Sequence, residues 1–426
     1  MQLKSRVLTH LQLATCAATL TRIEAKPQNA VGAAKLAWCL AVPSNRIRDC
    51  CLTALPPSSQ HNRAKFCPKV GSALSLLPNE TPQERAFGAT APGAEDLGPV
   101  LSRRFKAYGP VAKRSIFQLV TTAAAFIALL VVMASASHDH YWLTLLLAIP
   151  AAGLLVRLFI IQHDCGHGSF FKSRGANDYL GRALSVLTLT PYGSWSQGHA
   201  AHHASTGNLD RRGRGDVETW TVEEYQASPP LKKLFYRLYR NPLVMVILGA
   251  PINFIVLQRL PLGHGFRDPK SRRSILSLNV ALLVAFGLSF SLIGVRPVVV
   301  TYLPVMVIAS WIGNWLFYVQ HQFESSGWER DTDWNFHVAA LGGSSYFKLP
   351  AILQWFSGNI GLHHVHHLCS RIPNYRLQAC LDSAPELNRV AKVITLRESL
   401  GCWRLALWDE RRRLLVGFRD LKPRVA

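Results

Sequence analysis

The chain has 426 residues, of which 49% are apolar, and its 47 Lys and Arg outnumber its 25 Asp and Glu to give a formal net charge of +22. The apolar residues are gathered into long uncharged runs between basic loops, which is typical of an integral membrane protein and argues against a row of soluble domains. Because the sequence contains no RNA- or DNA-binding motif, we attribute the positive charge to membrane lipids and cytosolic loops rather than to nucleic acid. The nine cysteines show no CxxC spacing, which argues against a disulfide framework and favours a reducing compartment.

Residues 1–100 differ from the rest of the chain. They contain no sustained apolar run, and eleven basic residues stand against six acidic ones, with no acid before Glu24. A basic segment with few acids is typical of an organelle transit peptide, and it is equally compatible with a disordered extension or with an upstream stretch wrongly included in the reading frame. We assign no fold to this segment.

The apolar runs after residue 100 predict two helical hairpins in a membrane. Residues 116–134 and 141–161 form the first pair of predicted spans, and residues 274–295 and 298–320, joined by a turn at "GVRP", form the second. The run 242–257 lies between the hairpins and has about 16 residues, fewer than the roughly 20 that a spanning helix needs. It also contains a proline and an asparagine, so we expect an interfacial or re-entrant helix there.

The number of crossings leads to a prediction of topology. Two spans in each hairpin return the chain to its starting side, so residues 162–273 and 321–426 face one compartment, which the basic flank before the first span indicates is the cytosol. We predict an all-α integral membrane protein with about four transmembrane helices in two hairpins, interfacial helices and a cytosolic cap rich in histidine. If the run 242–257 crossed the membrane, the histidines on either side of it could not share a site.

Histidine is concentrated in the two predicted cytosolic regions. Eight of the sixteen histidines form three groups, in the stretches "HDCGH", "HAAHH" and "HHVHH". These eight are His163, His167, His199, His202, His203, His363, His366 and His367, and His364 is an additional member of the third group. Residues three or four apart share one face of a helix, so each group can direct two imidazoles at one metal. The adjacent histidine of each HxxHH points about 100° away and can serve a second metal.

The number of histidines favours two metal ions over one. A catalytic zinc ion typically takes three protein ligands, and eight or more histidines exceed what one such ion needs. Neutral imidazole binds iron, zinc, copper and nickel, so the spacing alone leaves the metal open. A lone HxxxH pair is more often an ordinary surface or core pair, whereas three groups on one predicted face indicate a metal centre. The isolated histidines that we interpret as ordinary residues are His10, His61, His138, His140 and His264.

At these residues the chain resembles the membrane fatty acid desaturases, whose signature is an HxxxH or HxxxxH box followed by two HxxHH boxes. The resemblance extends from about residue 100 to about residue 380 and is strongest for the acyl-lipid, omega-6-type (delta-12-type) desaturases of bacteria and plastids. It rests on the stretches "IQHDCGHGSFF", "GHAAHHASTGNLDRRGRGD", "NWLFYVQHQFE", "GSSYFKLP" and "QWFSGNIGLHHVHHLCSRIPNYRL". We therefore expect a membrane desaturase domain at residues 101–385 and a basic, cytosolic C-terminal tail at residues 386–426.

The resemblance also implies a set of ligands. In this family the boxes bind two iron ions, and one more histidine near the end of the last spanning helix completes the set. That role falls on His321 in "YVQHQFE", with His337 as its competitor. Residues that could support the ligands indirectly, through a ring N–H or a bound water, are Asp164, Asp210, Asp216, Asn314 and His364.

The activity that the resemblance implies is an oxygen-dependent desaturation of a fatty acyl chain, linked to a lipid, which introduces a cis double bond of the omega-6 or delta-12 type. The reaction uses O2 and two electrons. Because the sequence lacks an "HPGG" haem-binding string, the electrons are expected from a separate protein, ferredoxin by resemblance or cytochrome b5 as the alternative. Fatty acyl hydroxylases and carotenoid-modifying oxygenases share the histidine boxes and remain alternatives, whereas a metal transporter would place its ionisable groups inside the spans.

Other residues near the boxes are candidates for contact with a substrate or a partner. The aromatic side chains that could line an acyl channel, or pack the core instead, are Phe170, Phe171, Trp195, Trp315, Phe317, Trp355 and Phe356. The basic residues that could receive a lipid phosphate or an acidic electron donor are Arg211, Arg212, Arg214 and Arg371. A solvated cytosolic loop is the alternative interpretation of this basic set.

Overall fold

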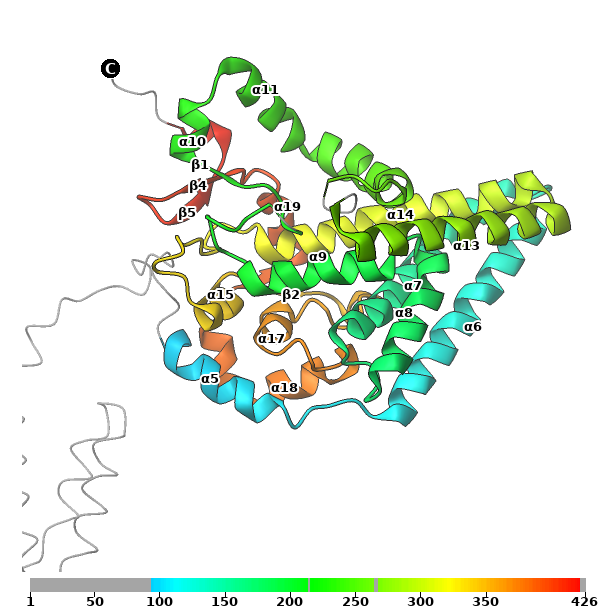
Figure 1. Cartoon of the computed structure of the whole chain (residues 1–426), viewed down its shortest axis with the longest axis horizontal. Coiled ribbons are helices and arrows are strands. Elements are labelled where there is room, and N and C mark those ends of the chain that lie inside the picture. Colours follow the sequence, from blue (N-terminus) through cyan, green and yellow to red (C-terminus); the bar gives the residue numbers. More distant parts are fainter. Residues whose placement is uncertain (1–92, 214, 264–266, 422–426) are drawn as a thin grey trace, which may run out of the picture. The chain divides into compact units, whose positions relative to one another are not determined.

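The computed structural model describes residues 93–213, 215–263 and 267–421, so our expectations for residues 1–92 and for Arg214 lie outside the described part. The described part is mainly helical, with five strands of two or three residues. Figure 1 shows four long helices, α6, α7, α13 and α14, that run into a region of shorter helices, strands and loops. We call this region, made of residues 93–111, 168–213, 215–239 and 322–421, the cap.

Four helices are long and apolar enough to cross a membrane, namely α6 (Ala112–Ala136), α7 (Tyr141–His167), α13 (Pro269–Ile293) and α14 (Val295–His321). Short connections join α6 to α7 and α13 to α14, which confirms the predicted fold class and its two hairpins. Many apolar side chains of α6 and α13 are exposed, as expected of surfaces that face lipid. α7 is the most buried of the four and packs against both α6 and α14.

The helices α7 and α14 extend beyond the predicted apolar runs, and the extensions carry histidines. α7 ends at His167, where Gly168 adopts the left-handed conformation with φ of 67° and donates its N–H to the carbonyl oxygens of Asp164 and Cys165. Glycine takes this conformation without the steric cost of a Cβ atom, so the sequence "CGHG" ends the helix directly after the first histidine box. α14 likewise ends at a histidine, His321.

The run 242–257 does not form one straight spanning helix. It contains η4 (Leu243–Gly249), η5 (Ile252–Val256) and the start of η6 (Leu257–Arg259), and this segment is bent by 56° from α11 (Pro230–Tyr239). By length and composition the bent pair is either a broken span or a re-entrant loop. Histidines from both sides of it meet in one centre, described below, so we infer that it does not cross the membrane.

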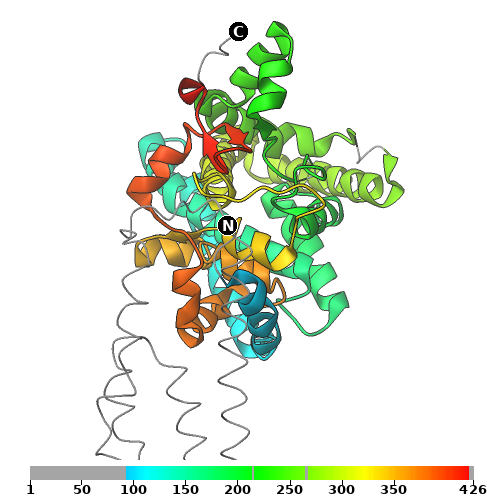
Figure 2. The ribbon, with the colours of Figure 1, turned by 90° about the vertical axis from the view of Figure 1, so that its left-hand side faces the viewer.

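Two small sheets connect distant parts of the cap. The first has the order β1 (Trp220–Thr221), β4 (Leu407–Asp409), β5 (Leu414–Val416), and in the second β2 (Tyr346–Lys348) pairs in parallel with β3 (Val393–Thr395). Residues 386–421, which we expected to be a tail, are therefore paired with earlier segments of the cap. Figure 2 shows this segment, in red, beside the green segment that contains β1.

The other short elements surround the ends of the long helices. In chain order they are α5 (Ala94–Phe105), α8 (Arg174–Thr188), α9 (Tyr192–Ser205), α10 (Val222–Ala227), α15 (Phe336–Gly342), α16 (Ala351–Phe356), α17 (His363–Leu368), η7 (Asn374–Arg376), α18 (Leu377–Ser383), η8 (Pro385–Arg389), α19 (Leu396–Cys402) and η9 (Phe418–Asp420). α5 begins at Ala94, before the domain start that we expected, and packs against α15 and α17. α9 carries the second histidine box and packs against α7 and α13. This packing brings the second box close to the first box, which lies at the end of α7.

Candidate metal centre

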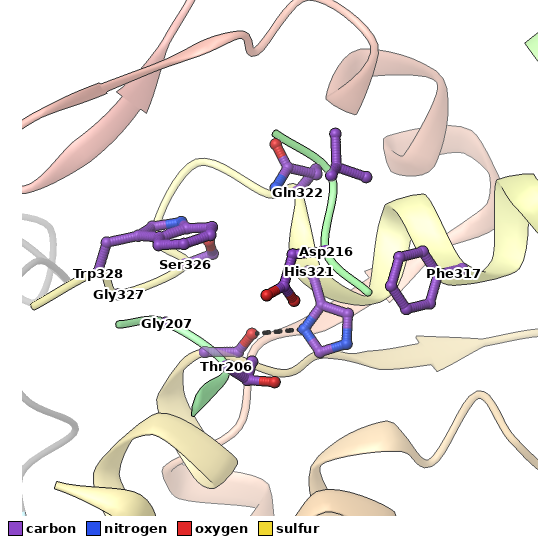
Figure 3. A pocket seen from close by; sticks show the side chains of 11 residues that line it. Thr206, Gly207, Asp216, Phe317, His321, Gln322, Ser326, Gly327 and Trp328 are labelled. Atoms are coloured by element: carbon purple, nitrogen blue, oxygen red, sulfur yellow. Dashed lines mark hydrogen bonds between the residues drawn. The ribbon is translucent and has the colours of Figure 1, made fainter. Parts of the chain in front are cut away.

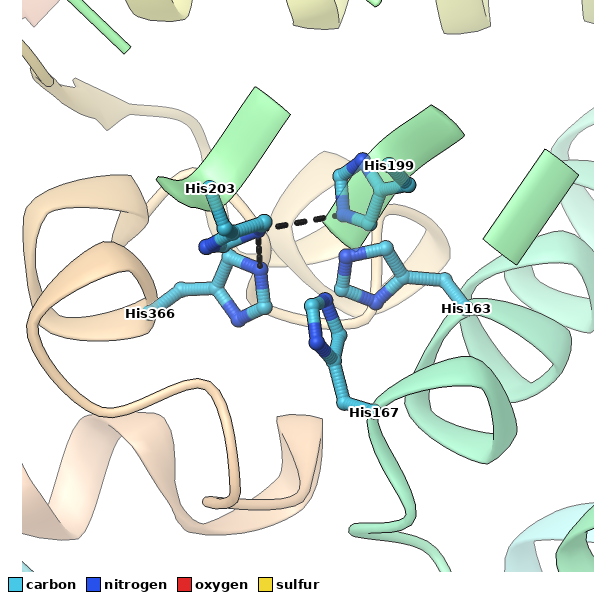
Figure 4. A group of neighbouring side chains, drawn as sticks. All are labelled: His163, His167, His199, His203 and His366. Atoms are coloured by element: carbon cyan, nitrogen blue, oxygen red, sulfur yellow. Dashed lines mark hydrogen bonds between the residues drawn. The ribbon is translucent and has the colours of Figure 1, made fainter. Parts of the chain in front are cut away.

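All nine histidines that we expected as ligands gather in two groups. Group 1 consists of His163, His167, His199, His203 and His366, and group 2 consists of His202, His321, His363 and His367. Within each group, one ring nitrogen from every histidine lies within 4.8 Å of the others. Figure 4 shows the side chains of group 1 converging from α7, α9 and α17.

Helical spacing explains how the boxes divide between the two groups. On α9, His199 and His203 are four residues apart and both belong to group 1, while His202 belongs to group 2. On α17 the arrangement is reversed, because His366 belongs to group 1 and the pair that is four residues apart belongs to group 2. Neighbouring residues differ by about 100° around a helix. Helical geometry thus turns the adjacent histidines of one box toward different groups.

The ring nitrogens lie at the spacing expected of ligands that share an ion. In group 1, His203 Nε2 is 3.1 Å from His199 Nε2 and 3.0 Å from His366 Nε2. In group 2, His363 Nε2 is 2.9 Å from His321 Nε2 and 3.1 Å from His367 Nε2. Imidazole nitrogens that bind one metal at about 2.0–2.1 Å are about 3 Å apart when they are adjacent ligands.

Burial favours the neutral form of five clustered histidines in the cap. Burial, together with neighbouring imidazoles, holds the pKa well below the ordinary histidine range for His199, His203, His363, His366 and His367. Removing a histidine from water disfavours its charged form, so its pKa falls. A neutral imidazole offers a lone pair, which is the form that binds metal.

Acceptors behind the rings fix their orientation. Asp164 Oδ1 is 3.3 Å from His163 Nδ1, and Asp216 hydrogen-bonds to His202 Nδ1. A backbone carbonyl lies 3.2 Å from His321 Nδ1. Each of these contacts places the ring proton on Nδ1 and leaves Nε2 free to bind a metal.

Several of the free nitrogens are buried without a hydrogen-bond partner among the described residues. These atoms include His163 Nε2, His167 Nε2 and His202 Nε2. A buried polar atom without a partner costs roughly 1–3 kcal/mol, so a set of them is poorly explained by packing alone. A metal ion would bind these lone pairs, and the donor set fits one transition-metal ion in each group.

Known proteins resemble this chain over most of its described part. Residues 140–389 match the protein family described as Fatty acid desaturase. A protein of Bacillus subtilis named fatty acid desaturase is 42% identical over 313 residues, which cover 74% of this chain and 88% of that protein. The chain belongs to the fatty acid desaturase family.

More distant relatives of this desaturase have names that specify lipids. A Synechocystis protein named sn-1 oleoyl-lipid 12-desaturase is 28% identical over 241 residues, which cover 54% of this chain and 65% of that protein. A second Synechocystis protein, named sn-1 acyl-lipid omega-3 desaturase (ferredoxin), is 28% identical over 244 residues, which cover 53% of this chain and 63% of that protein. The match therefore spans slightly less than two thirds of each of these two relatives.

Three residues that we considered beside the boxes lie outside both groups of the desaturase. His364 is buried on α17, where its ring is 6.1 Å from that of Tyr346, and burial lowers its pKa to about 4. Asn314 is half-buried on α14, seven residues before His321. His337 lies on α15 and belongs to neither group, so His321 rather than its competitor joins the histidine cluster.

Of the three aspartates that could orient histidines, Asp164 and Asp216 contact a ring nitrogen. Asp210 instead accepts hydrogen bonds from Arg330 at 2.8 Å and from the backbone N–H of Asp331 at 2.9 Å. Asp210 and Asp216 lie in the same loop, and the path of that loop after α9 brings only the second one back to the histidines.

Two of the predicted basic residues are engaged in ion pairs within the cap. Arg211 lies 2.9 Å from Asp331, and Arg212 pairs with Glu224. Arg371 is exposed near the third box. The ion pairs indicate that Arg211 and Arg212 hold the loop that follows α9.

Two of the predicted aromatic side chains stand beside the histidines of the desaturase. Trp195 stacks on His199 with ring centroids 4.7 Å apart, and Phe317 lies 5.2 Å from His202. Phe317 also lines a small pocket beside group 2 (Figure 3). Other residues that line this pocket are Thr206, Asp216, His321, Gln322, Ser326 and Trp328.

The remaining predicted aromatic side chains contact other aromatic rings. The ring centroids of Phe170 and Phe171 are 5.0 Å apart, those of the stacked Trp315 and Tyr318 are 5.9 Å apart, and those of Trp355 and Phe356 are 5.0 Å apart. These contacts are those of core packing for the first two pairs, whereas Trp355 is 47% exposed.

Two buried amides behind group 1, Gln118 and Asn374, were not predicted from the sequence. Asn374 donates to Asp164, and Gln118 donates to Asn374. A signal for Gln118 was present, because a polar residue inside an apolar spanning run usually faces a partner. Asn374 occurs in the stretch "IPNY", where no pattern distinguishes it from a turn residue.

Proposed function

We propose that this desaturase introduces a cis double bond into a lipid-linked fatty acyl chain at the omega-6 (delta-12) position, with one iron ion bound in each histidine group. The observation that carries the proposal is the division of nine histidines into two groups with ligand spacing. The name of the relative that acts as an sn-1 oleoyl-lipid 12-desaturase supports the lipid-linked chain and the position of the double bond.

Iron is proposed because the reaction is an oxidation. Two hydrogens leave adjacent methylene groups of the acyl chain, and O2 with two electrons and two protons gives two molecules of water. When bound, the metal pair supplies the oxidising chemistry, which zinc cannot do because it has no redox activity. The residues of the chain hold neutral imidazoles at fixed spacing, orient them through Asp164 and Asp216, and keep the centre buried.

The electrons are proposed to come from a separate ferredoxin, with cytochrome b5 as the alternative. A relative whose name includes ferredoxin supports a donor of this kind. We propose that the cap faces the cytosol or, in a plastid, the stroma. The basic flank before α6, with Arg103, Arg104 and Lys106, supports this orientation by the positive-inside bias.

Expression in a host without polyunsaturated lipids tests the proposal. The host should also contain a ferredoxin and its reductase, and total fatty acid methyl esters should be analysed by gas chromatography with mass spectrometry. We expect a new diene with its second double bond at the delta-12 position, formed from the oleoyl chains of the host. His363→Ala should abolish the product, because His363 belongs to group 2. The matched control is His337→Ala, which removes a histidine outside both groups and should retain the product.

Other products would change the proposal in defined ways. A double bond at the omega-3 position would replace the proposed position and keep the reaction. Hydroxylated acyl chains would show that the centre acts as a hydroxylase. Unchanged acyl chains in cells where the protein holds two irons and receives electrons would contradict an acyl substrate and turn attention to a carotenoid.

A further inference from the structure

We propose that Asn374 and Gln118 are positioning residues for group 1, which act through Asp164 to hold His163 in the orientation that binds metal. This inference rests on the proposed function. It goes further by assigning a task in metal binding to two amides that lie outside the histidine boxes and come from segments far apart in the sequence.

A continuous chain of hydrogen bonds connects these residues. Asn374 donates to Asp164 Oδ2 from its backbone N–H at 2.7 Å and from Nδ2 at 2.8 Å. The other carboxylate oxygen, Oδ1, is 3.3 Å from His163 Nδ1. Gln118 Nε2 donates to Asn374 Oδ1 at 2.8 Å, and Asn374 Nδ2 lies 3.3 Å from Gln118 Oε1. One oxygen of the carboxylate thus contacts the histidine ring, and the other accepts the hydrogen bonds from Asn374.

All four residues of this polar chain are buried. Asp164 and Asn374 are each 1% exposed, His163 is 3% exposed and Gln118 is 5% exposed. A carboxylate removed from water is costly unless hydrogen bonds replace its hydration. Among the described residues neither Lys nor Arg forms an ion pair with it, and its other side-chain contact is the His163 ring. The two N–H groups of Asn374 therefore replace the water that this carboxylate loses.

The polar chain joins the helices that supply group 1. Asp164 lies in the last turn of α7, which carries two histidines of the group, and Asn374 begins η7, shortly after α17 with its third-box histidine. A second contact holds the same turn, since the Tyr375 hydroxyl accepts from the Val111 N–H at 2.9 Å and lies 2.8 Å from Ser115 Oγ. The turn after the third box is thereby fixed to both α6 and α7.

A purely structural role of the two amides and a positioning role lead to different expected results when the amides are removed. If the amides only contribute to packing, their loss lowers the melting temperature and leaves the affinity for iron unchanged in the folded protein. If they act through Asp164, their loss weakens the iron of group 1 and spares that of group 2. The loss of an outer-shell hydrogen bond typically weakens metal binding by about 10–100-fold.

The test is anaerobic chelator competition with ferrous iron on the purified full chain in detergent. Asn374→Leu keeps the approximate volume of the side chain and removes its amide. We expect one of two irons to bind about 10–100-fold more weakly and the other to keep its affinity. Gln118→Leu removes only the outer amide, so we expect a smaller loss at the same iron. If Asn374→Leu does not fold, Gln118→Leu carries the test.

Gln162→Leu is the matched control. Gln162 is fully buried next to His163, and it contacts Ser185 at 3.2 Å, Thr188 at 2.6 Å and the Thr190 carbonyl at 3.1 Å, away from Asp164. Its loss should lower the melting temperature and leave both iron affinities unchanged. An equal weakening of iron in Gln162→Leu and Asn374→Leu would overturn the inference, because general destabilisation would then explain both.

A double variant shows whether Asn374 acts through Asp164. Asp164→Asn alone should weaken the iron of group 1, and adding Asn374→Leu should weaken it no further, because residues of one network are not additive. Additive losses would show that Asn374 does not act through the carboxylate. Unchanged iron affinity in both amide variants, beside a wild type with two irons, would overturn this inference alone. A wild type that binds no iron would overturn the proposed function itself.

Discussion

Groups 1 and 2 contain the same kind of side chain, but different parts of the fold hold them. Behind group 1, the carboxylate that contacts His163 belongs to the next residue of the same spanning helix, Asp164. Behind group 2, the carboxylate that contacts His202 comes from Asp216 in the loop between α9 and β1. A loop carbonyl also holds the ring of His321. The carboxylate behind group 1 thus belongs to a membrane-spanning helix, whereas the carboxylate behind group 2 belongs to a loop of the cap.

The loops behind group 2 are fixed in turn by the C-terminal part of the chain. Arg240 is buried, and its guanidinium donates to Gln322 Oε1 at 2.7 Å and to the carbonyl oxygens of Leu405 at 2.9 Å and Glu218 at 3.1 Å. Gln322 directly follows a histidine of group 2, and Glu218 lies two residues after Asp216. Changes near Arg240 should therefore affect group 2 and spare group 1.

The largest separation of the two groups is expected from Asp216→Ala. The substitution removes the acceptor of His202 Nδ1, so the iron of group 2 should bind about 10–100-fold more weakly, while the iron of group 1 keeps its affinity. Anaerobic chelator competition on the purified protein measures both affinities. Loss of the two irons at the same chelator concentration would show that the groups do not have separate supports.

A smaller effect is expected from Gln322→Leu. The substitution removes the nearest acceptor of the buried Arg240 guanidinium, which should lower the free energy of unfolding by roughly 1–3 kcal/mol. The iron of group 2 should bind more weakly, though less so than in Asp216→Ala, because the carboxylate contact to His202 remains. Thermal unfolding in detergent and chelator competition measure the two effects. A weakening confined to group 1 would reverse the assignment of supports.

The smallest effect is expected from Asp210→Asn. Asp210 is a half-exposed partner of Arg330 and contacts neither group, and surface ion pairs contribute little to stability. Two irons per chain and a melting temperature close to that of the wild type are the expected result. Loss of iron in this variant, measured by elemental analysis, would show that the loop after α9 supports the centre at more than one carboxylate.

Local sequence patterns were enough to predict the spanning helices and eight of the nine clustered histidines, whereas the ninth, His321, followed from the family resemblance. An apolar run reports the part of a helix in lipid, and i, i+4 spacing reports a shared helix face, so both are visible within one segment. The predicted ends of the helices were less accurate than their positions in the chain, because α7 continues past its apolar run until Gly168 ends it. A polar helical extension into a cap carries no hydropathy signal.

Contacts between distant segments could not be predicted in this way. Gln118 and Asn374 are 256 positions apart, and the strand pairs that fix the C-terminal segment contain only two or three residues each. Strands this short show no period in the sequence. The choice between Asp210 and Asp216 also depended on the path of a loop, which the sequence pattern does not contain.

The number of irons that keep wild-type affinity in paired histidine variants tests the two-group arrangement most directly. Wild-type protein should bind two irons per chain. His202→Ala combined with His321→Ala removes two ligands from group 2 and should leave one iron with wild-type affinity. His202→Ala combined with His203→Ala alters neighbouring residues of one box but takes a ligand from each group, so no iron should keep wild-type affinity. Equal results for the two double variants, or one iron in the wild type, would contradict two separate metal sites.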